Sequence, residues 1–187
     1  MQVGNAWSRH ALAALFLSAA CAVATHAAGL LTREEALALA YPGATFSAER
    51  VFLTGAQQKQ AAEATGQPVT SALVARYVAS KDGKVIGRAY VDTHVIRTKK
   101  ETLLISLDEA GSVKRVDVTA FLEPSEYRAP PPFLSQYSGR ALTDDLRLQR
   151  AIRPIAGATL TASAVTDAVR RVLAIDKVLT GRAGAPK

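Results

Sequence analysis

The run KVIGRAYVDTHVI, residues 84–96, decides the fold class of this chain. Its β-branched and aromatic residues are typical of a strand, and alternate residues of a strand point to opposite faces of a sheet. One face would carry Val85, Gly87, Ala89, Val91 and Val95, and the other Arg88, Tyr90, Asp92 and His94. We expect the first face to be buried and the second to be partly in contact with water.

Three further runs of the same character surround this strand. They are ALVARYVAS at 72–80, ETLLISLD at 101–108 and SVKRVDVTAFL at 112–122. The segments between the four runs are KDG, RTKK and EAG, which are short and rich in turn-forming residues. Because short turns join antiparallel neighbours, the pattern predicts an antiparallel meander.

Helical patterns flank the predicted sheet on both sides in the sequence. Thr32 is placed to cap a short helix that Tyr41-Pro42-Gly43 would stop, and residues 55–67 read as a polar surface helix. Between them, residues 45–54 read as a strand. The closing helix is expected from about Leu160 to Leu179, with its apolar stripe on the sheet. That stripe consists of Val165, Ala168, Val169, Val172 and Leu179.

These elements predict an α+β fold: an antiparallel β-sheet with flanking helices and a long C-terminal helix. We expect a helical and strand extension at 28–71, the main domain at 72–180 and a flexible tail at 181–187.

The first residues, 1–27, have the organisation of a secretory signal peptide. Arg9 and His10 precede the apolar run ALAALFLSAACAVA, and small residues follow it. Cleavage is expected after Ala27, which would deliver the protein to the periplasm or cell envelope. An uncleaved anchor is one alternative. Another is a lipid anchor at Cys21, because LSAAC resembles a lipoprotein signal.

Composition argues against several classes of function. Aromatic residues make up only 6% of the chain, which disfavours a nucleic-acid surface built on base stacking. The chain has three histidines, His10, His26 and His94, and we interpret His94 as a surface or interface residue rather than a metal ligand. No G-x-S-x-G elbow and no Walker loop are present. The net charge is +7, or 7 − 1 = +6 without residues 1–27, where Arg9 is the charged residue. Such a charge is compatible with an acidic partner or an anionic lipid surface, but the basic residues are spread along the chain as on an ordinary solvated surface.

The stretch AGATLTAS, residues 156–163, places a glycine and several hydroxyls at the expected start of the closing helix. Free N–H groups and the helix dipole favour an anion there. A simpler interpretation is that Thr159 or Thr161 caps its own helix.

AGATLTASAV resembles the flavin-attachment motif of the FMN-binding domain family, whose pattern is roughly D-x-x-[ST]-G-A-T-x-[ST]. This family includes the flavin-bearing subunits of sodium-translocating NADH:quinone reductase and of Rnf-type electron-transport complexes. The resemblance implies that Thr159 carries FMN through a phosphoester bond, which an FAD-dependent flavin transferase would form. Gly157, Ala158 and Thr161 would complete the motif, and Leu160 would lie beside the flavin.

The likeness extends over about residues 73–179. FLSQYSG, residues 133–139, resembles an aromatic segment that these domains place upstream of the attachment loop. FLEPSEY, residues 121–127, stands where the family carries an E-T-P-G-like segment, which implies that Glu123 and Tyr127 lie near the flavin.

Two positions depart from the family pattern. Arg153 stands where the family has aspartate, and Ala156 stands where it has serine or threonine. An arginine there would pair with the phosphate or with the electron-rich edge of a reduced flavin. The departures leave open whether the FMN is covalent or noncovalent.

The resemblance therefore implies an exported flavoprotein that binds FMN and transfers electrons in the cell envelope. It implies a membrane or periplasmic redox partner and no nucleic acid. A flavin-dependent envelope reductase and a cofactor-free interaction module are the alternatives, so whether the protein is an enzyme in its own right stays open.

Overall fold

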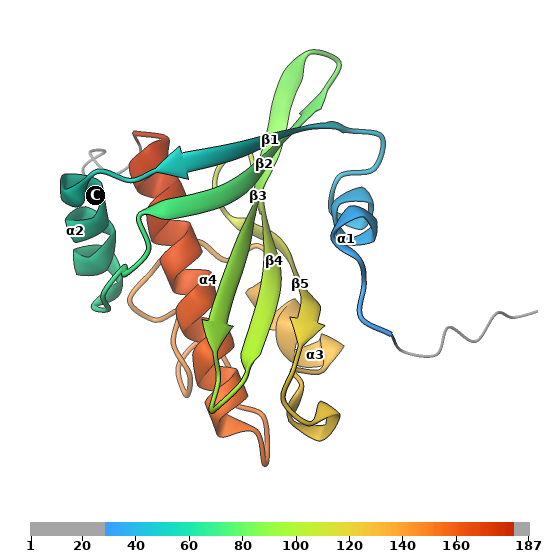
Figure 1. Ribbon diagram of the computed structural model, residues 1–187, viewed down its shortest axis with the longest axis vertical. Coiled ribbons are helices and arrows are strands. Elements are labelled where there is room, and N and C mark those ends of the chain that lie inside the picture. Colours follow the sequence, from blue (N-terminus) through green and yellow to red (C-terminus); the bar gives the residue numbers. More distant parts are fainter. Residues whose placement is uncertain (1–28, 182–187) are drawn as a thin grey trace, which may run out of the picture.

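The structure, a computed structural model, describes residues 29–181 (Figure 1). The expected signal peptide, including Cys21, and residues 182–187 of the expected tail lie outside the described residues.

A five-stranded antiparallel sheet forms the centre of the molecule, with its strands in sequence order. The strands are β1 (Thr45–Phe52), β2 (Leu73–Lys81), β3 (Lys84–Val95), β4 (Lys100–Asp108) and β5 (Val113–Phe121). Each strand pairs with its neighbour in the chain, which confirms the predicted meander.

Helices flank the sheet, so the expected α+β fold is confirmed. The longer helices are α1 (Arg33–Ala40), α2 (Gly55–Thr65) and α4 (Thr159–Leu179), and the short ones are η1 (Ser125–Tyr127), α3 (Pro131–Leu134) and η2 (Ser135–Tyr137). Thr32 caps α1 as expected: its hydroxyl accepts a hydrogen bond from the Glu35 N–H, and the Glu35 carboxylate accepts one from the Thr32 N–H.

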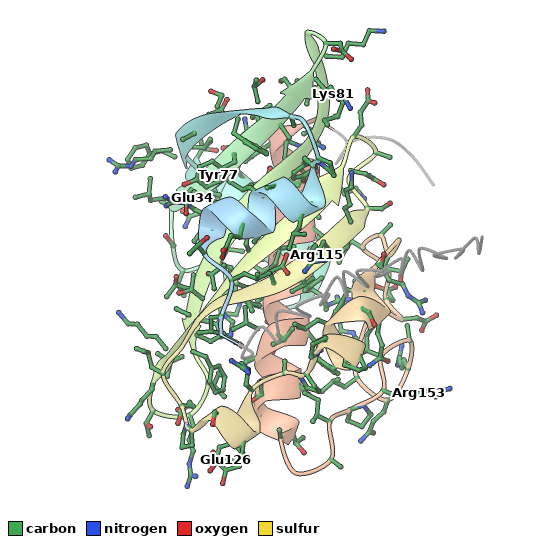
Figure 2. The ribbon with its side chains drawn as sticks, turned by 90° about the vertical axis from the view of Figure 1, so that its right-hand side faces the viewer. Glu34, Tyr77, Lys81, Arg115, Glu126 and Arg153 are labelled. Atoms are coloured by element: carbon green, nitrogen blue, oxygen red, sulfur yellow. The ribbon has the colours of Figure 1, made fainter. Side chains whose placement is uncertain are left out.

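The sheet has one buried face and one partly exposed face, as expected, but the two faces are exchanged: on the face expected to be buried, Val85 is 42% exposed and Val95 is 55% exposed. Helices α4 and α2 lie on one side of the sheet and α1 lies on the other (Figures 1 and 2). The face expected to be wet packs against α4, where Tyr90 is buried. The opposite face, with Ala89, lies under α1.

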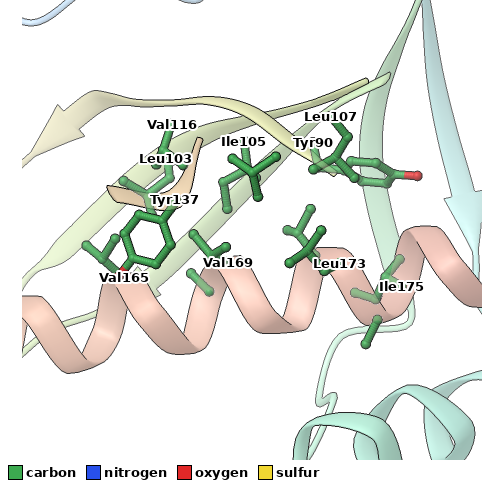
Figure 3. Close-up of a cluster of buried hydrophobic side chains, with 14 of the residues drawn as sticks. Tyr90, Leu103, Ile105, Leu107, Val116, Tyr137, Val165, Val169, Leu173 and Ile175 are labelled. Carbon is green, nitrogen blue, oxygen red and sulfur yellow. The ribbon is translucent and has the colours of Figure 1, made fainter. Parts of the chain in front are cut away.

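The main core fills the space between α4 and the sheet (Figure 3). Its larger members include Tyr90, Leu103, Ile105, Leu107, Val116, Tyr137, Val165, Val169, Leu173 and Ile175. The apolar stripe expected on the closing helix therefore does pack on the sheet.

Residues 29–71 belong to the same folded unit as the rest, although we expected an extension beside the main domain. Strand β1 pairs with β2 along its whole length, from Thr45 with Ser80 to Phe52 with Leu73. Leu53, after β1, and Ala61, in α2, belong to the core beneath α4. Of the helices within residues 29–181, none is long and apolar enough to span a bilayer.

The turn between β3 and β4 and the first turn of α4 lie at the same end of the molecule (Figure 1). This end brings together the segments that form the candidate site.

Candidate functional site

A cavity of about 500 Å³ lies at this end of the molecule. Three segments line it: residues 96–98 between β3 and β4, Glu123, Pro124 and Tyr127 around η1, and residues 157–161 at the start of α4. The cavity thus contains most of the residues singled out from the sequence. These are Gly157, Ala158, Thr159, Leu160, Thr161, Glu123 and Tyr127.

Thr159 is the first residue of α4, and its side chain is available for chemistry. It is exposed, and its hydroxyl makes no hydrogen bond with any of residues 29–181. The cap position is occupied by Ala158, which has no side chain able to bond the helix. Because no side chain caps α4, its positive N-terminal end remains able to stabilise an anion.

Thr161 does not cap the helix either, so the capping interpretation of these hydroxyls is wrong. Thr161 is buried, and its Oγ1 donates a hydrogen bond of 2.7 Å to the Tyr127 carbonyl. This bond joins the first turn of α4 to η1, and it therefore fixes two walls of the cavity relative to each other.

The backbone conformation at position 157 requires a glycine. Its φ is +76°, a left-handed conformation that other residues adopt only at a cost. A Cβ placed there would meet no atom of the described chain within 4 Å. The space beside Gly157 is therefore open to another molecule.

Glu123 fixes the third wall. Its Oε1 accepts hydrogen bonds of 2.8 Å from the backbone N–H groups of both Thr98 and Lys99. These bonds hold the pKa of Glu123 below its ordinary value. Although Glu123 lines the cavity as expected, part of its carboxylate is used to hold the turn between β3 and β4.

The cavity also has an exposed apolar surface. Tyr127 is 42% exposed and Leu160 is 56% exposed, and Ile96 and Pro124 lie beside them. Large apolar side chains that stay exposed next to a cavity are typical of a ligand site.

The turn residues Ile96, Arg97 and Thr98 are the part of the site that sequence reasoning missed. From the sequence, the RTKK segment is predicted only as a turn. No local signal in the sequence shows that this turn meets α4, because the turn and the motif are far apart along the chain.

Arg153 is the one expected site residue that does not line the cavity. Its backbone is held by Gln136, whose amide accepts from the Arg153 N–H at 2.9 Å and donates to its carbonyl at 3.2 Å. Its side chain is exposed, and Figure 2 shows it well away from Glu126 of η1. The structure does not bring this guanidinium to the other site residues.

His94, which we expect from the sequence to be a surface or interface residue, is half-buried and lines two grooves. Its side chain is only 13% exposed, and both ring nitrogens lie near carboxylates. Nδ1 is 2.9 Å from Asp92 and Nε2 is 3.1 Å from Glu101. Within residues 29–181, no group of side chains has an arrangement suited to a metal ion.

Comparison with protein-family models, curated proteins and solved structures finds no match to this chain. The interpretation of the site rests on its own residues.

Proposed function

We propose that this protein is an electron carrier of the cell envelope that holds FMN in the cavity, joined to Thr159 by a phosphoester. One observation carries the proposal. Glu123, Tyr127 and residues 157–161 are predicted from the sequence as neighbours of a flavin, and they line one cavity around an exposed Thr159 hydroxyl that makes no hydrogen bond with any of residues 29–181.

The size and lining of the cavity suit FMN. A volume of about 500 Å³ falls within the usual range for small-molecule sites. The phosphate would lie at the uncapped start of α4, within reach of the Arg97 and Thr98 side chains. The flavin ring would cover the exposed apolar surface of Tyr127 and Leu160.

Attachment requires only the Thr159 hydroxyl and a transferase that supplies FAD. The Thr159 oxygen forms a bond to the phosphorus nearest the riboflavin, the pyrophosphate bond breaks, and AMP leaves. The hydroxyl proton passes to a base of the transferase. Bound FMN supplies the redox chemistry, while the chain's own residues hold and orient it for a membrane or periplasmic redox partner.

The test is the intact mass and visible spectrum of the protein coexpressed with a flavin transferase. We expect yellow protein with a mass increase of one FMN, and we expect Thr159→Ala to lack the increase. Ser163→Ala removes a hydroxyl from the same helix outside the cavity, and we expect it to retain the flavin.

The other outcomes are equally informative. Yellow protein without the mass increase would reject the phosphoester and leave noncovalent FMN. Colourless protein of unmodified mass would reject the proposed function altogether.

A further inference from the structure

His94 lies at the centre of a group of four charged side chains beside the cavity, which we call the His94 quartet: Asp92, His94, Glu101 and Arg171. An ionised carboxylate can only accept hydrogen bonds. Since both ring nitrogens of His94 lie within hydrogen-bond distance of carboxylates, both must carry protons to donate. With both carboxylates ionised, the geometry requires an imidazolium at this position.

The remaining contacts leave the charges of the quartet balanced. Arg171 of α4 donates to both oxygens of Asp92, at 2.8 and 2.9 Å. Glu101 is fully buried, and its Oε1 has no partner among residues 29–181. With His94 protonated the quartet is neutral, and without that proton it carries one negative charge. His94 lines two grooves: Asp167 of α4 is the further titratable side chain in one, and Tyr90 of β3 is the further titratable side chain in the other.

The quartet lies next to the cavity. His94 and Glu101 pair across β3 and β4 at the base of the turn that forms one cavity wall. A groove of about 280 Å³ contains His94 and Arg171, and it shares Ile96 and Leu160 with the cavity. This groove, which His94 lines, therefore adjoins the cavity at these two side chains.

We propose that His94 holds a proton that tunes the midpoint potential of FMN bound in the cavity. This proton keeps the His94 quartet neutral when negative charge develops on the flavin. This inference rests on the proposed function. When an external donor, such as dithionite in an assay, passes two electrons to FMN and water supplies one proton, the site gains one negative charge. A neutral quartet does not repel that charge, whereas a quartet that has lost the His94 proton does.

The energetics of the imidazolium agree with this geometry. Burial opposes its charge, but the hydrogen bonds to Asp92 and Glu101 outweigh burial and raise the pKa of His94 to about 9. By linkage, a negative charge in the cavity would raise it further.

Two substitutions test the proposal because they should act in opposite directions. His94→Gln leaves the quartet with one negative charge, so we expect the midpoint potential at pH 7 to fall. Glu101→Gln leaves it with one positive charge, so we expect the potential to rise. Lys100→Gln removes an exposed charge next to Glu101 and should change the potential little, because solvent screens it.

The pH dependence provides a second readout. In the unsubstituted protein we expect the midpoint potential to fall more steeply as the pH rises through about 9 than the flavin alone would require. His94→Gln should abolish this steeper fall, and Glu101→Gln should move it to lower pH. The proton itself is observed by ¹⁵N NMR of the full chain without flavin, with His94→Gln used to assign the resonances. An imidazole that titrates near its ordinary value would overturn the proposal.

If the midpoint potential shifts in the same direction in His94→Gln and Glu101→Gln, the substitutions have loosened the cavity, and this result would also overturn the proposal. Circular dichroism checks that each variant folds. If His94→Gln does not fold, the direction of the shift in midpoint potential in Glu101→Gln tests the proposal. If the unsubstituted protein takes up no flavin, the proposed function and the redox tuning are both rejected. The NMR titration still reports the state of His94 in that case.

Discussion

Gly87 and Gly157 are both needed as glycines, but for different physical reasons. A Cβ on Gly87 would lie 2.4 Å from the Leu107 carbonyl oxygen and 2.5 Å from the Tyr41 ring. That ring carries the hydroxyl whose single proton is shared between the Arg88 and Leu107 carbonyls, and this contact anchors the end of α1 to the sheet. Gly157 is constrained only by its positive φ.

We therefore expect Gly87→Ala to lower the free energy of unfolding by about 1–3 kcal/mol, as overpacked sites do. Gly157→Ala should cost about 1–2 kcal/mol through backbone strain alone. Urea denaturation measures both values, and near-ultraviolet circular dichroism of Tyr41 reports its contact with the sheet. An unchanged aromatic signal in Gly87→Ala would contradict the close contact.

His94 also makes stability depend on pH. Its pKa rises from 6.5 to about 9 on folding, so its contribution to stability is fully present below pH 6.5. That contribution disappears as the pH rises through about 9. We expect the urea midpoint of the unsubstituted protein to fall between pH 7 and pH 10 by more than that of His94→Gln. Parallel curves for the two proteins would show that His94 is not protonated on folding.

At the scale of elements, the hydrogen bond between Thr161 and the Tyr127 carbonyl connects α4 to η1. Replacing Thr161 by Val keeps the shape of the side chain but removes the donor, and this should cost about 1 kcal/mol of stability. We also expect a smaller fraction of the protein to carry FMN after coexpression with a transferase, because two cavity walls separate.

Thr161→Ser keeps the hydroxyl and serves as the matched control. The measurements are urea denaturation and the ratio of flavin absorbance to protein absorbance. Equal flavin content in the valine and serine variants would mean that this bond does not shape the site.

Across the whole molecule, polar contacts fix how α4 lies on the sheet. Asp176, near the end of α4, accepts a hydrogen bond of 2.5 Å from Arg88 Nε and one of 2.8 Å from the Tyr90 hydroxyl. Arg171 pairs with Asp92 one turn earlier. In the first contact α4 supplies the carboxylate and the sheet the guanidinium, and in the second these roles are exchanged. The two contacts together therefore fix the position of α4 along its axis relative to the sheet.

Asp176→Ala should therefore be severe, because it leaves the Arg88 guanidinium buried without its carboxylate. Loss of one partner of such a pair costs about 3–5 kcal/mol. Asp145→Ala removes an exposed pair with Arg150 and should cost less than about 1 kcal/mol. Thermal and urea unfolding measure both. Similar losses in the two variants would refute the structural importance of Asp176.

Much of the fold follows from local signals. Strand alternation and turn chemistry predicted the meander, and the cap at Thr32 was placed correctly. The start of α4 was expected within one residue of Thr159. These features are determined by neighbouring residues, which is why the chain alone reveals them.

The burial of the sheet could not be predicted in the same way. Alternation separates Tyr90 from Ala89 but does not state which face receives a helix. Arg88 and Asp92 looked like solvent-facing residues because their partners, Asp176 and Arg171, lie about eighty positions later in the sequence. The same long range hid the turn at 96–98, which completes the cavity.

The sequence by itself therefore determined the class of fold and the hydroxyl to test, Thr159, since both depend on short-range patterns. Only the tertiary structure decided that Thr161 holds η1 rather than capping its helix, that Arg153 stays outside the cavity, and that His94 lies half-buried between two carboxylates. The physical reason is the same in each case. A side chain's role depends on the charge and hydrogen-bonding capacity of whatever folding places beside it, and here those partners come from distant parts of the chain.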